Sequence, residues 1–218
     1  PFVGKFIESL NIRYEIVGED FSPTKGERLM FVSNHPLGGL DGTIILKVLN
    51  EKFGTTRTLA NDFLMAVSPL KDWFVPINKV GSQVRHSAKL VEEMYESETH
   101  ILIFPAGLCS RKIKGKVMDL TWQKHFIQRA VQQKMNIVPV FFEGRNSNFF
   151  YNLARIRKAL RIKFNIEMVF LVDEMFRQRN QIFRLHIGNP IPWQTFTPSK
   201  RPIEWAEEIK QRTYALIK

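Results

Sequence analysis

The sequence of 218 residues has little cysteine, few long apolar runs and comparatively few acidic side chains. Its single cysteine, Cys109, cannot close an internal disulfide, which fits either a reducing compartment or a protein that needs no disulfides. The longest apolar stretches, such as Met168 to Val172, are far shorter than the ~20 residues that span a bilayer, so the sequence predicts no transmembrane helix. The chain lacks an initial Met and a signal-peptide pattern, so we expect a further segment upstream of Pro1.

Acidic residues number 21 against 32 Lys and Arg, which gives a net charge of +11. An apolar content of 44% excludes a disordered basic tail, and the length suits one domain over residues 1–218. Ten of the eleven surplus charges lie in two acid-free stretches, 99–118 and 144–166. The surplus predicts an anionic partner: nucleic acid, a membrane surface, an acidic carrier protein or a phosphorylated substrate.

Apolar segments of strand length alternate with segments of helical period. The pattern predicts strands over 28–34, 55–60, 100–104, 137–142 and 181–188, and helices over 41–52, 82–97, 122–135, 149–164 and 203–216. This alternation predicts an α/β layered single domain with a central, mostly parallel sheet flanked by helices. Ligands of such sheets bind at the carboxyl ends of strands, so the loops at His35 and Pro105 are the places to look.

The first of these loops, residues 33–42, carries a histidine and a carboxylate around two glycines. His35 is suited to accept a proton near neutral pH, and Asp41 would fix its tautomer and stabilise its charged form. Backbone amides of Gly38 and Gly39 would donate to a developing oxyanion. The alternative is structural: His35 is a turn residue and Asp41 is the N-cap of the next helix.

The Asn34-His35…Asp41 arrangement resembles the signature of the glycerolipid acyltransferase superfamily, the lysophosphatidic-acid-acyltransferase type. The resemblance implies that His35 deprotonates an acceptor hydroxyl, which attacks an acyl thioester, with Asp41 as its partner. It implies acyl-ACP or acyl-CoA as the donor, a lyso-lipid as the acceptor, and no bound cofactor. The family usually has four residues between His and Asp, whereas five intervene here, and a bulged turn at the glycines would absorb the extra residue.

Three later segments resemble further blocks of this family in the same order: 74–79, 103–111 and 138–141. By resemblance, the acceptor-binding residues are Asn34, Lys79, Gly107, Ser110, Arg111 and Lys112. Ala106 and Cys109 replace a glutamate and an arginine of the third block, which predicts an acceptor other than lysophosphatidic acid. The two motifs are closer to a haemolysin-like bacterial branch that makes amino-acid lipids such as ornithine or glycine lipids. The carboxylate of such an acceptor would be bound by Arg111, with Lys79 or Lys112 assisting.

The segment 151–164 combines an apolar stripe of helical spacing with a surrounding set of cations. The stripe consists of Leu153, Ile156, Leu160 and Phe164, and the cations predicted to contact a partner are Arg155, Arg157, Lys158 and Arg161. The partner is an anionic membrane surface or an acidic acyl carrier protein. The alternative is a core-packed helix with a solvated charged face. With the resemblance, this predicts a peripheral enzyme on the cytoplasmic face of a bacterial inner membrane.

Two other classes compete with an O-acyltransferase that transfers a fatty acyl chain: a basic nucleic-acid-binding protein and a non-catalytic lipid binder. Zinc-finger spacing, an RNP-type block and a helix-turn-helix pattern are all missing from the sequence, which counts against nucleic acid. The remaining histidines, His86, His100, His125 and His186, form no metal-ligand spacing with Cys109, so no metal is expected. No base adjoins Cys109 in sequence, so we expect a space-filling thiol there.

Overall fold

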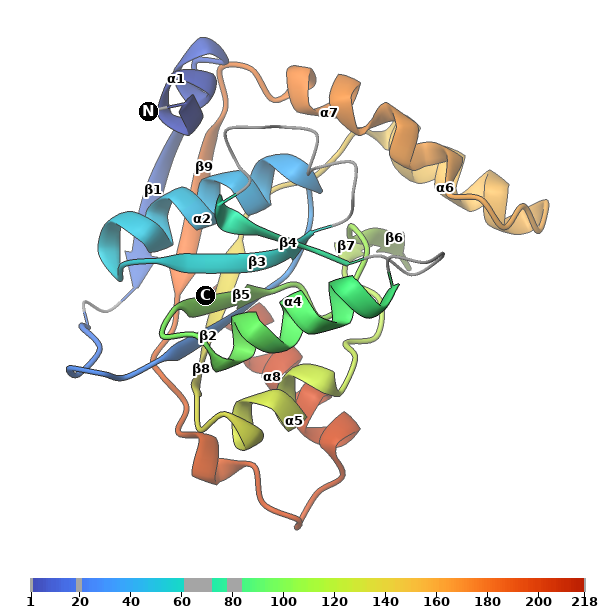
Figure 1. Ribbon diagram of the computed structural model, residues 1–218. Helices are drawn as coiled ribbons and strands as arrows, with labels where there is room; N and C mark the ends of the chain where they lie inside the picture. Colours follow the sequence, from blue (N-terminus) through green and yellow to red (C-terminus); the bar gives the residue numbers. More distant parts are fainter. Residues whose placement is uncertain (1, 19–20, 61–71, 78–83, 218) are drawn as a thin grey trace.

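The computed structural model describes residues 2–18, 21–60, 72–77 and 84–217, so the candidate Lys79 lies outside the described residues. Within them, seven strands form one sheet in the order β1-β9-β8-β2-β5-β3-β4 (Figure 1). The strands are β1 Arg13–Gly18, β2 Leu29–Ser33, β3 Thr56–Ala60, β4 Phe74–Pro76, β5 His100–Ile103, β8 Asn136–Phe142 and β9 Ile182–Ile187. All neighbours pair parallel except β8 and β9, which confirms the predicted mostly parallel sheet.

Helices cover both faces of this sheet, as predicted. One face carries α1 (Phe2–Ser9) and α2 (Gly39–Lys52); the other carries α4 (Val84–Glu96), α5 (His125–Gln132) and α8 (Pro202–Tyr214) (Figure 1). Both faces need covering because both are apolar: the side chains of β2, for example, alternate between two separate apolar cores. Leu29 and Phe31 pack with the α2 side, and Met30 and Val32 pack with the α4, α5 and α8 side.

Between β8 and β9 the chain forms an arm, which we define as residues 148–177: α6 (Asn148–Ala159), η2 (Ile166–Phe170) and α7 (Leu171–Arg177). Figure 1 shows α6 and α7 projecting from the body at the upper right. Because β9 pairs antiparallel with β8, β9 begins at the end of the sheet where β8 ends, and the arm connects the two strands at that end. The arm is thus a long hairpin-type connection between two antiparallel neighbours. A crossover connection would have made β9 parallel to β8.

Helix α6 ends five residues before the predicted end at Phe164, so that prediction was wrong in extent. Arg161 adopts a left-handed conformation with φ 55. The N–H of Arg161 donates to the carbonyl of Lys158 at 3.1 Å, and the N–H of Ile162 donates to the carbonyl of Arg157 at 3.1 Å. These two bonds form a Schellman motif, which terminates the helix at a residue that is not glycine.

The remaining elements had no clear pattern in the sequence. They are α1, β1 and β4, the hairpin of β6 (Arg111–Ile113) and β7 (Lys116–Met118), η2, α7, and η3 (Trp193–Thr195). The β6–β7 hairpin matters for the site, because it begins directly after the Pro105 loop. Both loops singled out from the sequence follow neighbouring parallel strands, β2 and β5, and therefore lie at the same edge of the sheet.

Candidate active site

His35 lies just after β2, and Asp41 lies in the first turn of α2. The Nδ1 atom of His35 is 3.2 Å from Oδ2 of Asp41, so the structure brings the pair together despite the five residues between them. The Asp41 side chain is fully buried, and the His35 side chain is 19% exposed. Nδ1 has no hydrogen bond of good geometry to a described residue, so Asp41 acts on the ring mainly as a charge.

The turn between the two residues depends on Gly38. Gly38 is the N-cap of α2 and has φ 83, a conformation in which glycine is the favoured residue. A Cβ placed there would lie 3.0 Å from both Sγ of Cys109 and Cδ1 of Leu171. The interpretation of Asp41 as an N-cap is wrong, since Asp41 is the third helical residue. Its Oδ2 accepts from the Leu37 N–H at 2.9 Å, which holds the turn closed.

The amides of Gly38 and Gly39, predicted to face an oxyanion, stand at the start of α2. The first N–H groups of a helix have no intrahelical acceptor, and the helix dipole favours negative charge there. Neither amide donates a hydrogen bond to another described residue. This turn therefore offers unpaired donors in the same loop as His35.

The environment of His35 raises its pKa above the ordinary value of 6.5. Burial by itself lowers the pKa of His35. The charge of Asp41, the short contact between its carboxylate and the ring, and the more distant charge of Asp119 together outweigh burial. The ring also stacks on Phe104, with ring centroids 4.1 Å apart and planes 27° apart. Phe104 follows β5 and His35 follows the neighbouring strand β2, so this ring contact joins the ends of the two strands.

Asp119 is a site residue that the sequence reasoning missed. Its buried carboxylate accepts from the His35 N–H at 3.2 Å, the Ser110 hydroxyl at 2.5 Å and the Trp122 indole N–H at 2.9 Å. Burial raises the pKa of Asp119, while the hydrogen bonds from Ser110 and Trp122 favour the charged form. One signal could have found it, because Asp119 is the first acid after the acid-free stretch 99–118.

Two predicted acceptor-binding residues are used by the fold itself. The amide of Asn34 donates to the carbonyl of Phe142 at 3.0 Å and accepts from its N–H at 2.8 Å. The Ser110 hydroxyl is bound to Asp119, and the Ser110 N–H donates to the carbonyl of His35 at 2.7 Å. In this structure both side chains join the His35 loop to its neighbours, and their binding of an acceptor stays a prediction.

Arg111 and Arg157 both bind Glu167. Arg111 Nη2 lies 2.8 Å from Oε1 of Glu167, and Arg157 Nε lies 2.9 Å from Oε2. Glu167 is completely buried, and the two arginines are 12% and 17% exposed. The guanidinium of Arg111 thus already holds a carboxylate of this chain, and Arg157 is not a surface cation.

The other predicted residues remain accessible. Gly107 is exposed in a turn with φ 66, and Lys112 is exposed on β6 with its Nζ 3.5 Å from Oδ1 of Asn148. Arg155, Lys158 and Arg161 are exposed on the arm and form no salt bridge with any described residue.

Cys109 is buried to 1% exposure, and burial raises the pKa of its thiol to about 12. A nucleophilic thiol needs access and an available thiolate, so this environment gives Cys109 a packing role.

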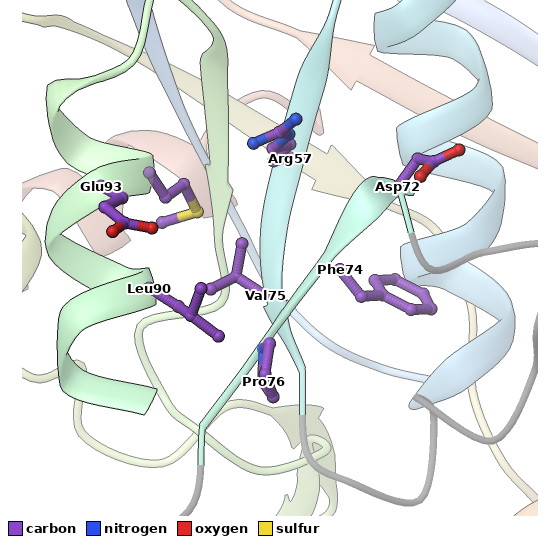
Figure 2. A pocket seen from close by; sticks show the side chains of 8 residues that line it. Arg57, Asp72, Phe74, Val75, Pro76, Leu90 and Glu93 are labelled. Atoms are coloured by element: carbon purple, nitrogen blue, oxygen red, sulfur yellow. The ribbon is translucent and has the colours of Figure 1, made fainter. Parts of the chain in front are cut away.

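One cavity among the described residues is not lined by His35. It measures about 250 Å³ and sits between β3, β4 and α4, where Leu90 and Glu93 face Val75 and Pro76 (Figure 2). A smaller cavity of about 130 Å³ is lined by Leu59, Ile103, Phe104, Pro105 and other residues around them. Phe104, whose ring stacks on His35, is the lining residue that connects the smaller cavity to the histidine, and His35 itself does not line it.

Among the described residues, no three His, Cys, Asp or Glu side chains gather in a way that could hold a metal ion. No helix within the described ranges is both long and apolar enough to cross a membrane.

Comparison with known proteins gives a consistent set of similarities. A family model described as acyltransferase matches residues 6–218. A lyso-glycine lipid O-acyltransferase of Phocaeicola vulgatus is 48% identical over 216 residues, covering 99% of this chain and 77% of that protein. A protein of the same name from Bacteroides thetaiotaomicron is 47% identical over 216 residues, covering 99% and 79%.

A solved structure shares the fold. The crystal structure of the 1-acyl-sn-glycerophosphate (LPA) acyltransferase PlsC from Thermotoga maritima aligns with a TM-score of 0.58 and 19% sequence identity. The alignment covers 97% of this chain and 74% of that one.

Proposed function

Because the chain belongs to the acyltransferase family, we propose that it is an O-acyltransferase that esterifies the hydroxyl of a lyso-lipid with a fatty acyl chain. The observation that carries the proposal is the His35–Asp41 pair, 3.2 Å apart at the start of α2. The residue spacing departs from the family signature, yet the geometry supports the same dyad.

In the proposed reaction, Nε2 of His35 takes the proton of the acceptor hydroxyl as its oxygen attacks the thioester carbonyl. Asp41, facing Nδ1, stabilises the imidazolium that forms. Negative charge develops on the carbonyl oxygen, where the amides of Gly38 and Gly39 donate hydrogen bonds. The intermediate collapses to the ester, the C–S bond breaks, and His35 returns the proton to the departing thiolate.

The acceptor we propose is an N-acylated amino acid of the lyso-glycine lipid type. Two relatives that cover nearly the whole chain carry that name. Such an acceptor presents a carboxylate, and Lys112, exposed on β6 directly after the Pro105 loop, is a cation that would meet it. Lys79 remains a second candidate from the sequence.

The donor we propose is an acyl thioester on acyl carrier protein or coenzyme A. No resident cofactor is needed, since the thioester supplies the activated acyl group and the dyad supplies the base. We propose that the enzyme works as a peripheral protein on the cytoplasmic face of a bacterial inner membrane, where its lipid acceptor is found.

The test measures transfer of a labelled acyl chain from a thioester to a lyso-glycine lipid. We expect His35→Ala to lower kcat/KM by roughly a thousandfold, because it removes the general base. His86→Ala, an exposed histidine on α4, is the matched control and should keep wild-type rates. Full turnover by His35→Ala would overturn the mechanism. Absence of transfer by the wild type to a broad panel of lyso-lipids would favour the non-catalytic lipid binder.

A further inference from the structure

The arm concentrates the exposed apolar surface of the protein. Among the described residues, fourteen large apolar side chains are exposed, and eight of them lie within residues 148–177. They are Phe149, Ile156, Leu160, Ile162, Phe164, Val169, Val172 and Phe176. Such a concentration marks an interaction surface, because apolar side chains scattered singly are the ordinary case.

The end of the arm has the most regular pattern, and we call residues 158–164 the tip. Every residue of the tip is exposed. Its apolar members, Leu160, Ile162 and Phe164, are 66%, 39% and 68% exposed. They are interleaved with Lys158, Arg161 and Lys163, none of which forms a salt bridge with a described residue. Three of the four residues of the apolar stripe predicted from the sequence, Ile156, Leu160 and Phe164, are therefore exposed, and Leu153 is partly buried.

Two of the three acids of the arm are buried. Of its three carboxylates, Glu167 is buried between Arg111 and Arg157, and Glu174 is buried against Ser147, which donates to it through both its N–H and its hydroxyl. Asp173 is the one arm carboxylate left exposed. Burying two acids leaves the outer surface of the arm strongly cationic and thus complementary to an anionic partner.

The root of the arm packs directly on the candidate active site. Leu171 of α7 lies so close to Gly38 that a Cβ there would be 3.0 Å from its side chain. Phe150 and Tyr151 of α6 form a small core with Cys109, which follows β5 in the Pro105 loop. A partner held at the tip would therefore be positioned relative to His35 through packed side chains.

We propose that the tip docks the enzyme on an anionic lipid bilayer. Leu160, Ile162 and Phe164 enter the boundary between headgroups and acyl chains, while Lys158, Arg161 and Lys163 pair with lipid phosphates. This inference rests on the proposed function, since the acceptor is itself a lipid. A bilayer accommodates both the apolar and the cationic side chains of the tip, whereas an acidic carrier protein would match its cations alone.

The test is sedimentation of the protein with vesicles of one part phosphatidylglycerol to two parts phosphatidylcholine. The double variant Leu160→Glu/Phe164→Glu should weaken binding at least about tenfold, because it removes two apolar anchors and adds two repelled charges. The matched control is Ile16→Glu/Ile217→Glu, which adds the same charge and also removes two exposed apolar side chains, at sites 48% and 46% exposed. The control should bind within about twofold of the wild type.

A second variant separates docking from folding. Arg161→Gly places glycine at a left-handed position, so the Tm should rise while vesicle binding falls. His35→Ala should bind vesicles like the wild type, so the result does not depend on turnover. Three outcomes would overturn the proposal: equal binding by the double variant and its control, tip-dependent binding to purified acyl carrier protein without vesicle binding, or a dimer that the double variant converts to monomer.

Discussion

At the residue scale, Asp119 sets the position of the proposed base. Its carboxylate receives the backbone N–H of His35 and the hydroxyl of Ser110, so it joins the His35 loop to the loop that follows β5. Asp41 faces the imidazole directly, while Asp119 acts on the same ring only through the backbone and through its charge. We therefore regard Asp41 as the proposed dyad partner and Asp119 as a positioning residue.

The pH dependence of the reaction reports this arrangement. A general base must be neutral, so kcat/KM should fall as the pH drops through the pKa of His35, which lies above 6.5. Asp119→Asn removes a negative charge that raises this pKa, so the acid limb of the pH profile should move to lower pH. The same change should cost about 2 kcal/mol of unfolding free energy, because hydrogen bonds to a buried charge are weakened.

Ser110→Ala is the control for this prediction, since it removes a hydrogen bond to Asp119 and keeps the charge. Its acid limb should stay where the wild-type limb lies. An unmoved limb in Asp119→Asn would show that Asp119 does not influence the proton affinity of His35.

At the element scale, the arm is attached by a buried ion cluster. Glu167 in η2 binds Arg111 of β6 and Arg157 of α6, so one carboxylate connects three elements. Removing one partner from a buried pair leaves uncompensated charge, and this is more costly than losing a surface pair. The arm therefore has a defined position on the body even though its tip is exposed.

Glu167→Gln should lower the free energy of unfolding by roughly 3 kcal/mol, because two partly buried guanidinium groups lose their anion. Urea unfolding measures the change. Asp173→Asn, an exposed carboxylate on the same arm, is the matched control and should stay within ~0.5 kcal/mol of the wild type. Equal stability of both variants would mean that the cluster contributes little to holding the arm.

The elements that the sequence predicted correctly are those with a strong periodic pattern. Strand β2 is buried at all five positions, and its apolar run is visible without a structure. Strand β1 has no buried residue, so its sequence carries no apolar pattern from which a strand could be predicted. The end of α6 depends on a left-handed arginine, and sequence patterns reserve that position for glycine or asparagine.

The candidate site shows the same division. The histidine and carboxylate are close in sequence, so their pairing could be predicted from spacing. Asn34 and Arg111 were assigned to the acceptor by resemblance. Their partners within the chain could not be seen in the sequence because they are remote: Phe142 lies 108 residues from Asn34, and Glu167 lies 56 residues from Arg111. Polar side chains that look available in a motif are in fact satisfied by distant parts of the chain.

At the scale of the whole molecule, the net charge of +11 can be spread evenly over the surface or concentrated in one region. A uniform positive field would attract any polyanion, including nucleic acid, whereas a local cationic surface would select a partner that also accepts apolar side chains. The arm favours a local cationic surface, because its cations surround exposed apolar residues and two of its acids are buried.

A pair of triple variants distinguishes the two distributions of charge. The first replaces the tip cations with glutamine: Lys158→Gln, Arg161→Gln and Lys163→Gln. The second makes the same change at exposed lysines on the body: Lys25→Gln, Lys124→Gln and Lys134→Gln. Each lowers the net charge by three, so a uniform field predicts equal losses of binding to anionic vesicles. A local surface predicts that only the tip variant loses affinity, by about tenfold or more, since each cation near the bilayer contributes about 1 kcal/mol. Equal losses in the two variants, or a steep salt-dependent affinity of the wild type for random DNA, would instead assign the charge to the molecule as a whole.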